Sequence, residues 1–433
     1  MSGDAHVVRP DRSQLRWDMI DLEALLADDH RVRIVWSFAE SLDLSELYAA
    51  IKSREGEPGR PAADPMVLLA LWLYATVEGV GSARELDRLA ERDLAYRWLA
   101  GGVPVNYHGL ADFRVDHVAL LDRLLTESVT ALVAEGLVSL TEISVDGTKV
   151  RASASKGSFK TEATLARIAA AVGLRIAALK AELTDDPQAG SRRRQAARQR
   201  AAREVQSRAA AARATLDKLR AEKQQRAKSH SKDEANKSEP KASLSDAEAR
   251  SMRFADGAVH PAYNAQIAAA SREGIIVAVE ITDRRNDAGL AEPMVANLVE
   301  RYGKTPARLL VDTNYATSED IEALARHPAG PVLVFAPPPG ERDDVQPATL
   351  AKRAKARALE GDIIKAWRAR MASSDGQAIY RSRKLIERIN GHCKNHGFGF
   401  IAVRGRVKAK AVALLHALAN NLMAAHRLRS KPA

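Results

Sequence analysis

The sequence predicts an α/β protein with three parts: a helical N-terminal domain, a mixed sheet, and a helical hairpin that interrupts the sheet after its first strand. Three observations lead to this prediction. Residues 13–135 carry apolar residues at helical spacings and no alternating pattern. An alternating, β-branched pattern starts near residue 140 and returns after residue 260. The stretch between them, residues 152–245, is charged and has the spacing of paired helices.

The helical character of the N-terminal region is clearest at Pro65–Glu78. Apolar residues on one face repeat at spacings of three and four: Met66, Leu69, Leu73 and Val77. The other faces are apolar too, so we expect this helix to be buried all round. Asp64 suits the N-cap and Pro65 the first helical position. Further apolar repeats cover residues 86–90 and 120–125.

The sheet region is expected to contain five strands. The first, Thr141–Val150, alternates and is rich in β-branched residues. The later strands are Ala262–Ala270, Gly274–Ile281, Ala307–Val311 and Gly330–Ala336, with helices at Ala288–Tyr302 and Asp320–Arg326. This order predicts a mixed sheet layered with helices.

The interrupting segment reads as an antiparallel helical hairpin. A seam in its first helix repeats at spacings of three and four: Leu165, Ile168, Val172, Ile176, Leu179 and Leu183. A turn follows at residues 185–190, and a second helix, rich in Ala and Arg, returns through residues 205–219. Residues 228–243 have the composition of a flexible linker.

The basic charge of the chain is concentrated in two blocks. The 433 residues carry a formal net charge of +11, with a pI near 9.7. Residues 191–228 contain 13 Lys or Arg and three acids, and residues 351–433 contain 19 Lys or Arg and four acids. Such blocks favour a nucleic-acid partner, although two solvated helical faces would have the same composition.

Several classes of protein are excluded by composition. A single cysteine, Cys393, excludes an internal disulfide framework and any zinc site that needs two thiolates from one chain. The longest apolar run, Met66–Val77, is too short to cross a membrane, and the first residues lack an apolar signal segment. We therefore expect a cytoplasmic protein without a membrane partner. Phosphate-binding loops, dinucleotide fingerprints and a convincing Ser-His-Asp arrangement are also missing from the sequence.

Two acids on predicted strands are candidates for chemistry. Asp146 interrupts the first strand, where burying a carboxylate is costly unless it is paired or binds a metal. Asp312 directly follows an apolar strand, at the carboxyl end where open α/β sheets usually have their sites. Each could instead begin a turn, because Gly147 follows one and Thr313-Asn314 the other.

A third acid belongs to a polar stripe in Gln377–Lys394. Tyr380, Arg383, Glu387 and Lys394 occupy relative positions 0, 3, 7 and 14. At about 100° per residue these side chains fall within roughly 60° on one helix face. An acid between a phenol and two cations can form a site, or simply a solvated face with salt bridges. Gly391 leaves open whether the helix reaches Lys394.

The Y-x2-R-x3-E-x6-K spacing of this stripe resembles the signature of bacterial insertion-sequence transposases of the DDE class. The chain looks similar to family 1182, within the broader insertion-sequence 4/5 superfamily. SVDGTKVRASAS resembles the family's first-aspartate strand, LLVDTNYATSEDIEAL its second-aspartate segment, and DGAVHPAYNAQIAA the strand between them. PAADPMVLLALWLYA and NYHGLADFR look like its helical N-terminal domain, and KAKAVALLHALANNLMAA like its late helix. After the second aspartate, Thr313 and Asn314-Tyr315 depart from the expected small residue and Gly-Tyr pair.

The resemblance implies an RNase H-like catalytic core that cleaves DNA at transposon ends and joins them to target DNA. Asp146, Asp312 and Glu387 would be the catalytic, metal-binding triad for Mg²⁺, or Mn²⁺ in its place, with two ions expected. Phosphoryl transfer suits this set, because two hard cations about 4 Å apart stabilise the attacking and leaving oxygens and prefer carboxylate ligands. The partners would be the terminal inverted repeats and target DNA, and a second subunit in a homodimer.

The resemblance also suggests DNA contacts around the triad. Tyr380, Arg383 and Lys394 would position DNA beside it. Trp367, in the segment 341–376, could stack on a flipped base, although we favour a core position. His108 and Arg114 could contact transposon ends, or could be an ordinary loop and helix start. Further candidates have weaker support: Tyr263, Asn264 and Gln266 could support the site from the adjacent strand, whereas His392, Cys393 and His396 are unlike a structural zinc site.

The expected domains are a DNA-binding domain at 1–135, the core at 136–152 and 246–433, and the inserted basic hairpin with its linker at 153–245. Two alternatives to a DDE transposase remain open at this point. One is a DNA-binding protein that has lost the chemistry, and the other is an RNase H-like nuclease without strand transfer.

Overall fold

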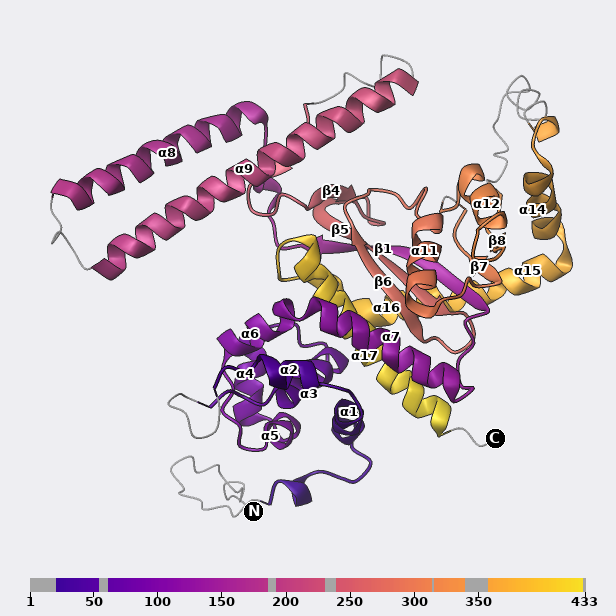
Figure 1. The fold of residues 1–433 in the computed structure, drawn as a ribbon, viewed down its shortest axis with the longest axis horizontal. Coiled ribbons are helices and arrows are strands. Elements are labelled where there is room, and N and C mark those ends of the chain that lie inside the picture. Colours follow the sequence, from indigo (N-terminus) through magenta and orange to yellow (C-terminus); the bar gives the residue numbers. More distant parts are fainter. Residues whose placement is uncertain are drawn as a thin grey trace, which may run out of the picture.

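A computed structural model describes residues 21–53, 61–185, 192–229, 239–313, 315–338 and 357–430. It has three parts, which Figure 1 shows as a group of N-terminal helices, a central sheet with flanking helices, and a long hairpin that projects from the sheet. None of the helices in these ranges combines the length and the hydropathy needed to cross a bilayer.

The N-terminal part is helical throughout its described residues. After a short 3₁₀ turn (Glu23–Leu25) come α1 (Arg31–Glu40), α2 (Ser45–Ala50), α3 (Pro65–Val77), α4 (Ala83–Arg92), α5 (Leu94–Ala100), α6 (Tyr107–Asp116) and α7 (Val118–Ala134). As predicted, α3 is buried on most of its surface. Its N-terminus is capped by Asp64, whose carboxylate accepts a hydrogen bond from the backbone N–H of Met66 at 2.8 Å. The helix α3 therefore forms the centre of the N-terminal part, and α1, α4, α5 and α6 pack around it.

The sheet is mixed, as expected. Its strands are β1 (Glu142–Ala152), β4 (Arg250–Arg253), β5 (Val259–Ala270), β6 (Ile276–Thr282), β7 (Arg308–Leu310), β8 (Leu333–Phe335) and β9 (Phe400–Ile401). The central path is β4-β5-β1-β7-β8, and β6 also pairs with β5 and β9 with β1. β1 is antiparallel to β5 and parallel to β7, and β7 is parallel to β8. The five predicted strands are confirmed, whereas the short strands β4 and β9 were not predicted.

Helices follow the later strands. They are α11 (Ala291–Tyr302), α12 (Ser318–Ala325), α14 (Asp362–Ala372), α15 (Ser374–Tyr380), α16 (Lys384–Cys393) and α17 (Arg406–Arg429). The stretch predicted as one helix at Gln377–Lys394 is divided: a 3₁₀ turn (Arg381–Arg383) joins α15 to α16. Gly391 does not end α16, because the helix continues to Cys393 and then into a π-helical turn (Lys394–Phe398).

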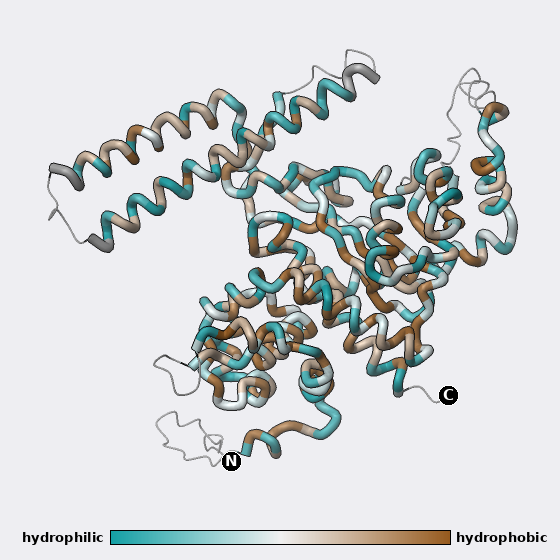
Figure 2. The backbone as a smooth tube through the Cα atoms, in the orientation of Figure 1, coloured by the Kyte–Doolittle hydropathy of each residue, from teal (hydrophilic) through white to brown (hydrophobic). Residues whose placement is uncertain are grey.

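The predicted hairpin is present. It consists of α8 (Glu162–Asp185) and α9 (Arg192–Ser229), and a two-stranded ladder of β2 (Phe159–Lys160) and β3 (Ala242–Ser243) closes its base. Leu165 of the seam packs with Ala212 and Leu216 of the return helix. In Figure 2, α9 is mostly hydrophilic, in contrast to the apolar strands of the sheet. Most of the expected linker, residues 230–238, lies outside the described residues.

The helical domain and the sheet share one continuous apolar core, which is joined by α17. This helix packs against β6 and against α3 and α7. The side-chain amide of Asn421 accepts from the backbone N–H of Ile276 and donates to its carbonyl, both at 2.7 Å. The amide therefore provides hydrogen-bond partners for the backbone N–H and carbonyl of Ile276, which buried backbone groups require.

Candidate active site

Asp146 lies in the middle of β1, where it is held by two side chains of the α15–α16 region. Its carboxylate accepts hydrogen bonds from Nη2 of Arg383 at 2.7 Å and from Nδ2 of Asn390 at 2.8 Å. These partners are 237 and 244 positions away in the sequence. A carboxylate placed in a strand thus obtains the charged partner that its burial requires.

Arg383 connects two acids of the predicted triad. Its side chain is buried, and its second terminal nitrogen, Nη1, donates to Glu387 at 2.7 Å, one helical turn further on. Nε of Arg383 is buried without a hydrogen-bond partner among the described residues. One guanidinium therefore bridges Asp146 and Glu387, whose side chain is largely exposed to solvent.

Asp312 approaches the same group from β7. It lies two residues after the end of this strand and accepts a hydrogen bond from the backbone N–H of Thr313 at 2.7 Å. Its negative charge acts on Asp146, Tyr380 and Arg383 alike. Asp146 and Glu387 therefore share one cation, and Asp312, from a third segment, acts on that cation electrostatically.

Tyr380 and Lys394 border this group. Burial raises the pKa of the Tyr380 phenol, and the charges of Asp312 and Glu387 raise it further while Arg383 opposes them. Burial lowers the pKa of the Lys394 ammonium, and Asp146 counteracts this effect. Tyr380, Arg383 and Lys394 of the predicted stripe thus each interact with at least one of the three acids.

The electrostatics of the site show an excess of negative charge. Burial raises the pKa of Asp146; Asp287 and Asp312 raise it further, whereas Arg383 and Asn390 lower it. The pKa of Arg383 is raised because the surrounding carboxylates outweigh its burial. Additional positive charge near Asp146 would therefore be favourable.

The donor atoms suit a hard divalent cation by chemistry, since all three acids offer carboxylate oxygens. Among the described residues, however, no group of three His, Cys, Asp or Glu side chains is arranged to hold one ion together. Arg383 and Asn390 already bind both oxygens of Asp146. In this conformation the guanidinium neutralises the acids that a metal would bind.

Asp287 is a fourth acid that the sequence reasoning missed. It accepts hydrogen bonds from Asn264 and Gln266 of β5, and it lies against Gly147, the residue after Asp146. Asn264 and Gln266 were expected to support the site, and they do contact this acid. Asp287 follows a polar turn, RRN, whose composition gives no indication of a site.

Other candidates lie elsewhere. Trp367 is 5% exposed and packs in the core, so it is not placed to stack on a base. Arg114 is 8% exposed, lies over the ring of Trp72 and donates to the Gly81 carbonyl, so it packs the helical domain and does not face DNA. His108 is exposed at the start of α6 and stacks on Tyr107.

Two further groups of candidate residues also lack a role in the candidate active site. The hydroxyl of Tyr263 donates to Asp246 and accepts from the backbone of Gly405, which places this side chain at the start of α17 and away from Asp146. His392 and His396 stack at 4.1 Å between ring centroids, and Cys393 between them is buried. None of these belongs to a metal-binding cluster within the described part of the chain.

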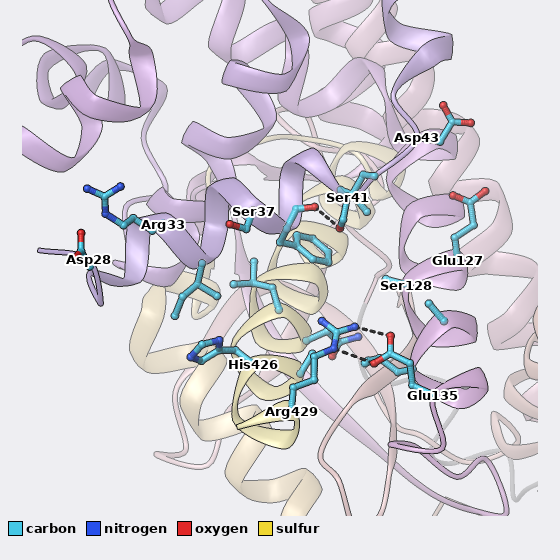
Figure 3. Close-up of a pocket in the computed structure, with 18 residues that line it drawn as sticks. Asp28, Arg33, Ser37, Ser41, Asp43, Glu127, Ser128, Glu135, His426 and Arg429 are labelled. Carbon is cyan, nitrogen blue, oxygen red and sulfur yellow. Dashed lines mark hydrogen bonds and ion pairs between the residues drawn. The ribbon is translucent and has the colours of Figure 1, made fainter. Parts of the chain in front are cut away.

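A separate cavity of about 740 Å³ lies between α1, α7 and the end of α17. Figure 3 shows the ion pair of Arg429 and Glu135 at its edge, where Nη2 and Oε1 are 2.7 Å apart. The cavity contains none of the acids around Asp146, so it is distinct from the candidate active site.

Comparison with known families agrees with the geometry. Residues 240–423 match the family model described as a transposase DDE domain, and residues 20–116 match a second one described as a transposase domain (DUF772). Neither the curated proteins nor the solved structures contain a significant match to the chain. The mixed sheet and its helices are compatible with an RNase H-like core. The chain thus matches two transposase family models in two separate segments, and this combination supports a transposase function.

Proposed function

We propose that this protein is a DDE transposase that cleaves DNA at the ends of its element and joins them to target DNA. The observation that carries the proposal is the guanidinium of Arg383, which donates to both Asp146 and Glu387 and lies within the electrostatic influence of Asp312. Two of these acids and Arg383 lie within the segment that matches the transposase DDE domain. The strand order β6-β5-β1-β7-β8, with β1 between an antiparallel and a parallel neighbour, supports an RNase H-like core.

The reaction consists of two phosphoryl transfers. Water attacks a phosphodiester at the element's end, one P–O bond forms as another breaks, and a 3′-hydroxyl is released. That hydroxyl then attacks a target phosphodiester, so one bond is again exchanged for another. Divalent ions, Mg²⁺ or Mn²⁺, would stabilise the charge on the attacking and leaving oxygens. Asp146, Asp312 and Glu387 would hold these ions, with two expected by resemblance.

The cations beside the triad have separate roles in this proposal. If Asp146 and Glu387 were to hold metal, Arg383 would be without its two carboxylate partners, and its planar fork could bind a DNA phosphate. Lys394 would act as a point charge toward the DNA backbone, and Tyr380 would position the strand. These three residues therefore orient DNA, while the acids hold metal.

The remaining parts would bind DNA outside the chemical centre. The helical domain contains the segment that matches the second transposase domain, and it would recognise the element's ends. The basic helix α9 would contact the phosphate backbone, and two subunits would pair the two ends, as the family resemblance implies. His108 is the exposed candidate on the helical domain.

The decisive experiment is cleavage of a labelled DNA fragment that carries the element's own end, with Mg²⁺ or Mn²⁺. Wild type is compared with Asp146→Asn, Asp312→Asn and Glu387→Gln, and with Glu300→Gln as a control, since Glu300 is an exposed acid on α11 outside the site. We expect metal-dependent cutting in wild type and the control only, with DNA binding retained in all. In the three variants of the triad, the cleavage rate should fall by at least about 100-fold, the effect of losing a central catalytic group.

The products distinguish the alternatives. Joined molecules, in which the cut end is attached to target DNA, support transposition. Nicks without joined molecules would indicate a nuclease, and binding without cutting under both metals would indicate a DNA-binding protein without chemistry.

A further inference from the structure

We propose that Asp287, Gln266 and Tyr315 are positioning residues that fix the backbone of Asp146 relative to that of Asp312. They form a hydrogen-bonded network on the side of the sheet opposite Arg383. The inference rests on the proposed function, because it concerns the spacing of two of its metal ligands. It assigns a role to an acid that is not part of the triad.

The network starts at Asp287. Its Oδ1 accepts a hydrogen bond from Nδ2 of Asn264 at 2.7 Å and another from Nε2 of Gln266 at 2.8 Å. Both donors lie on β5, where Gln266 is paired with Gly147 of β1 and Asn264 with Lys149. The carboxylate is therefore fixed to the strand that neighbours Asp146.

Gly147 allows Asp287 to approach the backbone of β1. A methyl group built at Gly147 would lie only 2.1 Å from Oδ1 of Asp287, which is far inside contact distance. Because successive residues of a strand point to opposite faces, Gly147 faces away from the side occupied by the Asp146 carboxylate. Asp287 thus packs against β1 at Gly147, the residue directly after Asp146, on the face opposite the Asp146 carboxylate.

Tyr315 extends the network to Asp312. Its hydroxyl donates to Oε1 of Gln266 at 2.6 Å, and its ring is almost completely buried. Its backbone N–H donates to the carbonyl of Asp312 at 3.0 Å. A continuous path of contacts therefore runs from Gly147 through Asp287, Gln266 and Tyr315 to Asp312.

A role in stability alone does not explain this composition. Three polar side chains are packed where apolar ones would stabilise the sheet at least as well, and Asp287 places a negative charge close to Asp146. A hydrogen-bonded network does, however, restrict the backbone to fewer arrangements. Metal ligands need such support, and mutation of residues that orient ligands commonly weakens metal binding by about 10- to 100-fold.

The test compares two tyrosines that make similar hydrogen bonds. Tyr315→Phe removes the bond to Gln266, and Tyr302→Phe removes a 2.8 Å bond from α11 to the carbonyl of Val277, outside the site. Asp287→Asn is the second variant, because it keeps the size of the side chain and removes the charge. Each full-length protein is examined for the melting temperature with and without MgCl₂ or MnCl₂, for binding of end DNA, and for the metal dependence of cleavage.

We expect both tyrosine variants to lower the melting temperature by similar amounts. Only Tyr315→Phe and Asp287→Asn should reduce the rise in melting temperature on metal addition and raise the metal concentration for half-maximal cleavage by about 10-fold. A metal response in these two variants equal to that of Tyr302→Phe would overturn the inference while leaving the proposed function intact. Wild type that neither cleaves nor responds to metal would instead overturn the proposed function, and this inference with it.

Discussion

At the residue scale, Arg383 is the group on which the candidate site depends. The sequence placed it on one helix face with Glu387, because residues four apart are neighbours on a helix. The structure adds Asp146, which lies 237 positions earlier, as its second partner. Asp287 could not be predicted in this way, since it follows β6 and meets its partners Asn264 and Gln266 only when β6 pairs with β5.

Removal of Arg383 should expose the competition between guanidinium and metal. In Arg383→Gln, Asp146 keeps Asn390 but loses its charged partner, so the protein without metal should be less stable by about 3 kcal/mol, as for other broken buried pairs. Divalent metal should then raise the melting temperature more in the variant than in wild type. Thermal unfolding with and without MgCl₂ measures this difference. An equal or smaller rise in the variant would show that Arg383 does not occupy the position of a cation.

His416 on α17 gives a pH-dependent expectation at the same scale. Burial, with further contributions from the nearby His396 and His392, lowers the pKa of this imidazole from 6.5 to about 3. Since the folded pKa lies below the unfolded one, its contribution to stability is complete above pH 6.5 and is lost as the pH falls toward 3.

The measurement is thermal unfolding between pH 7 and pH 5 for wild type and His416→Gln. Wild type should lose about 2 kcal/mol from this residue over that range, at about 1.4 kcal/mol per pH unit below 6.5. The variant should lose less, because glutamine does not titrate. Parallel pH profiles for the two proteins would contradict the assignment.

At the scale of elements, the hairpin is the part whose charge is most unequal. The helix α8 is close to neutral, whereas α9 carries almost all of the excess Lys and Arg. Arg200, Arg203 and Lys218 are exposed on α9, and Arg167 and Arg175 are exposed on α8. Affinity for DNA from phosphate contacts falls with salt in proportion to their number. The hairpin therefore offers a strongly basic helix and a nearly neutral one for comparison.

Neutralising Arg200, Arg203 and Lys218 to Gln should weaken binding to end DNA and reduce its salt dependence, by about one unit of slope per lost phosphate contact. The control neutralises Arg167 and Arg175 on α8 and should leave both unchanged. Binding is measured between 50 and 200 mM salt, a range in which about six contacts change affinity 1,000-fold. If the two sets of substitutions weaken DNA binding equally, the basic residues of α9 act only through nonspecific electrostatic attraction.

Removal of the whole hairpin separates DNA contacts from subunit contacts. The β2–β3 ladder pairs Lys160 with Ala242, so a two-residue Asn-Gly turn can join them. If the hairpin mediates dimerisation, the shortened protein should lose self-association in sedimentation experiments. If the hairpin binds DNA instead, the shortened protein should lose affinity for end DNA and keep its self-association. Unchanged end binding and self-association would remove both roles.

At the scale of the whole molecule, the helical domain and the sheet are one body. The sequence suggested a boundary near residue 135, but α17 packs against both sides of it, and the apolar core is continuous. The contact between Arg301 of α11 and Asp122 of α7, 2.5 Å apart, also crosses that boundary. A recognition domain fixed in this way would hold the element's end at a constant position relative to the acids.

A substitution at Asn421 tests whether the helical domain and the sheet unfold together. Asn421→Leu fills a similar volume but leaves the N–H and carbonyl of Ile276 unpaired, at a cost of about 1–3 kcal/mol for each group. Because the core is continuous, the loss should lower one common unfolding transition, followed by far-UV circular dichroism and by tryptophan fluorescence from the helical domain. Two separate transitions in the variant would show that the two parts unfold independently.

Sequence alone was enough to predict the mixed α/β class, the five main strands and the hairpin, because these depend on periodicity within short segments. Only the folded chain shows that Asp146 meets Arg383, that Arg114 is buried, and that Asp287 contacts Asn264 and Gln266. Each of these outcomes depends on contacts between segments far apart in the chain. Local spacing carries no information about such pairing, because strand register and helix packing are set by the burial of the whole core.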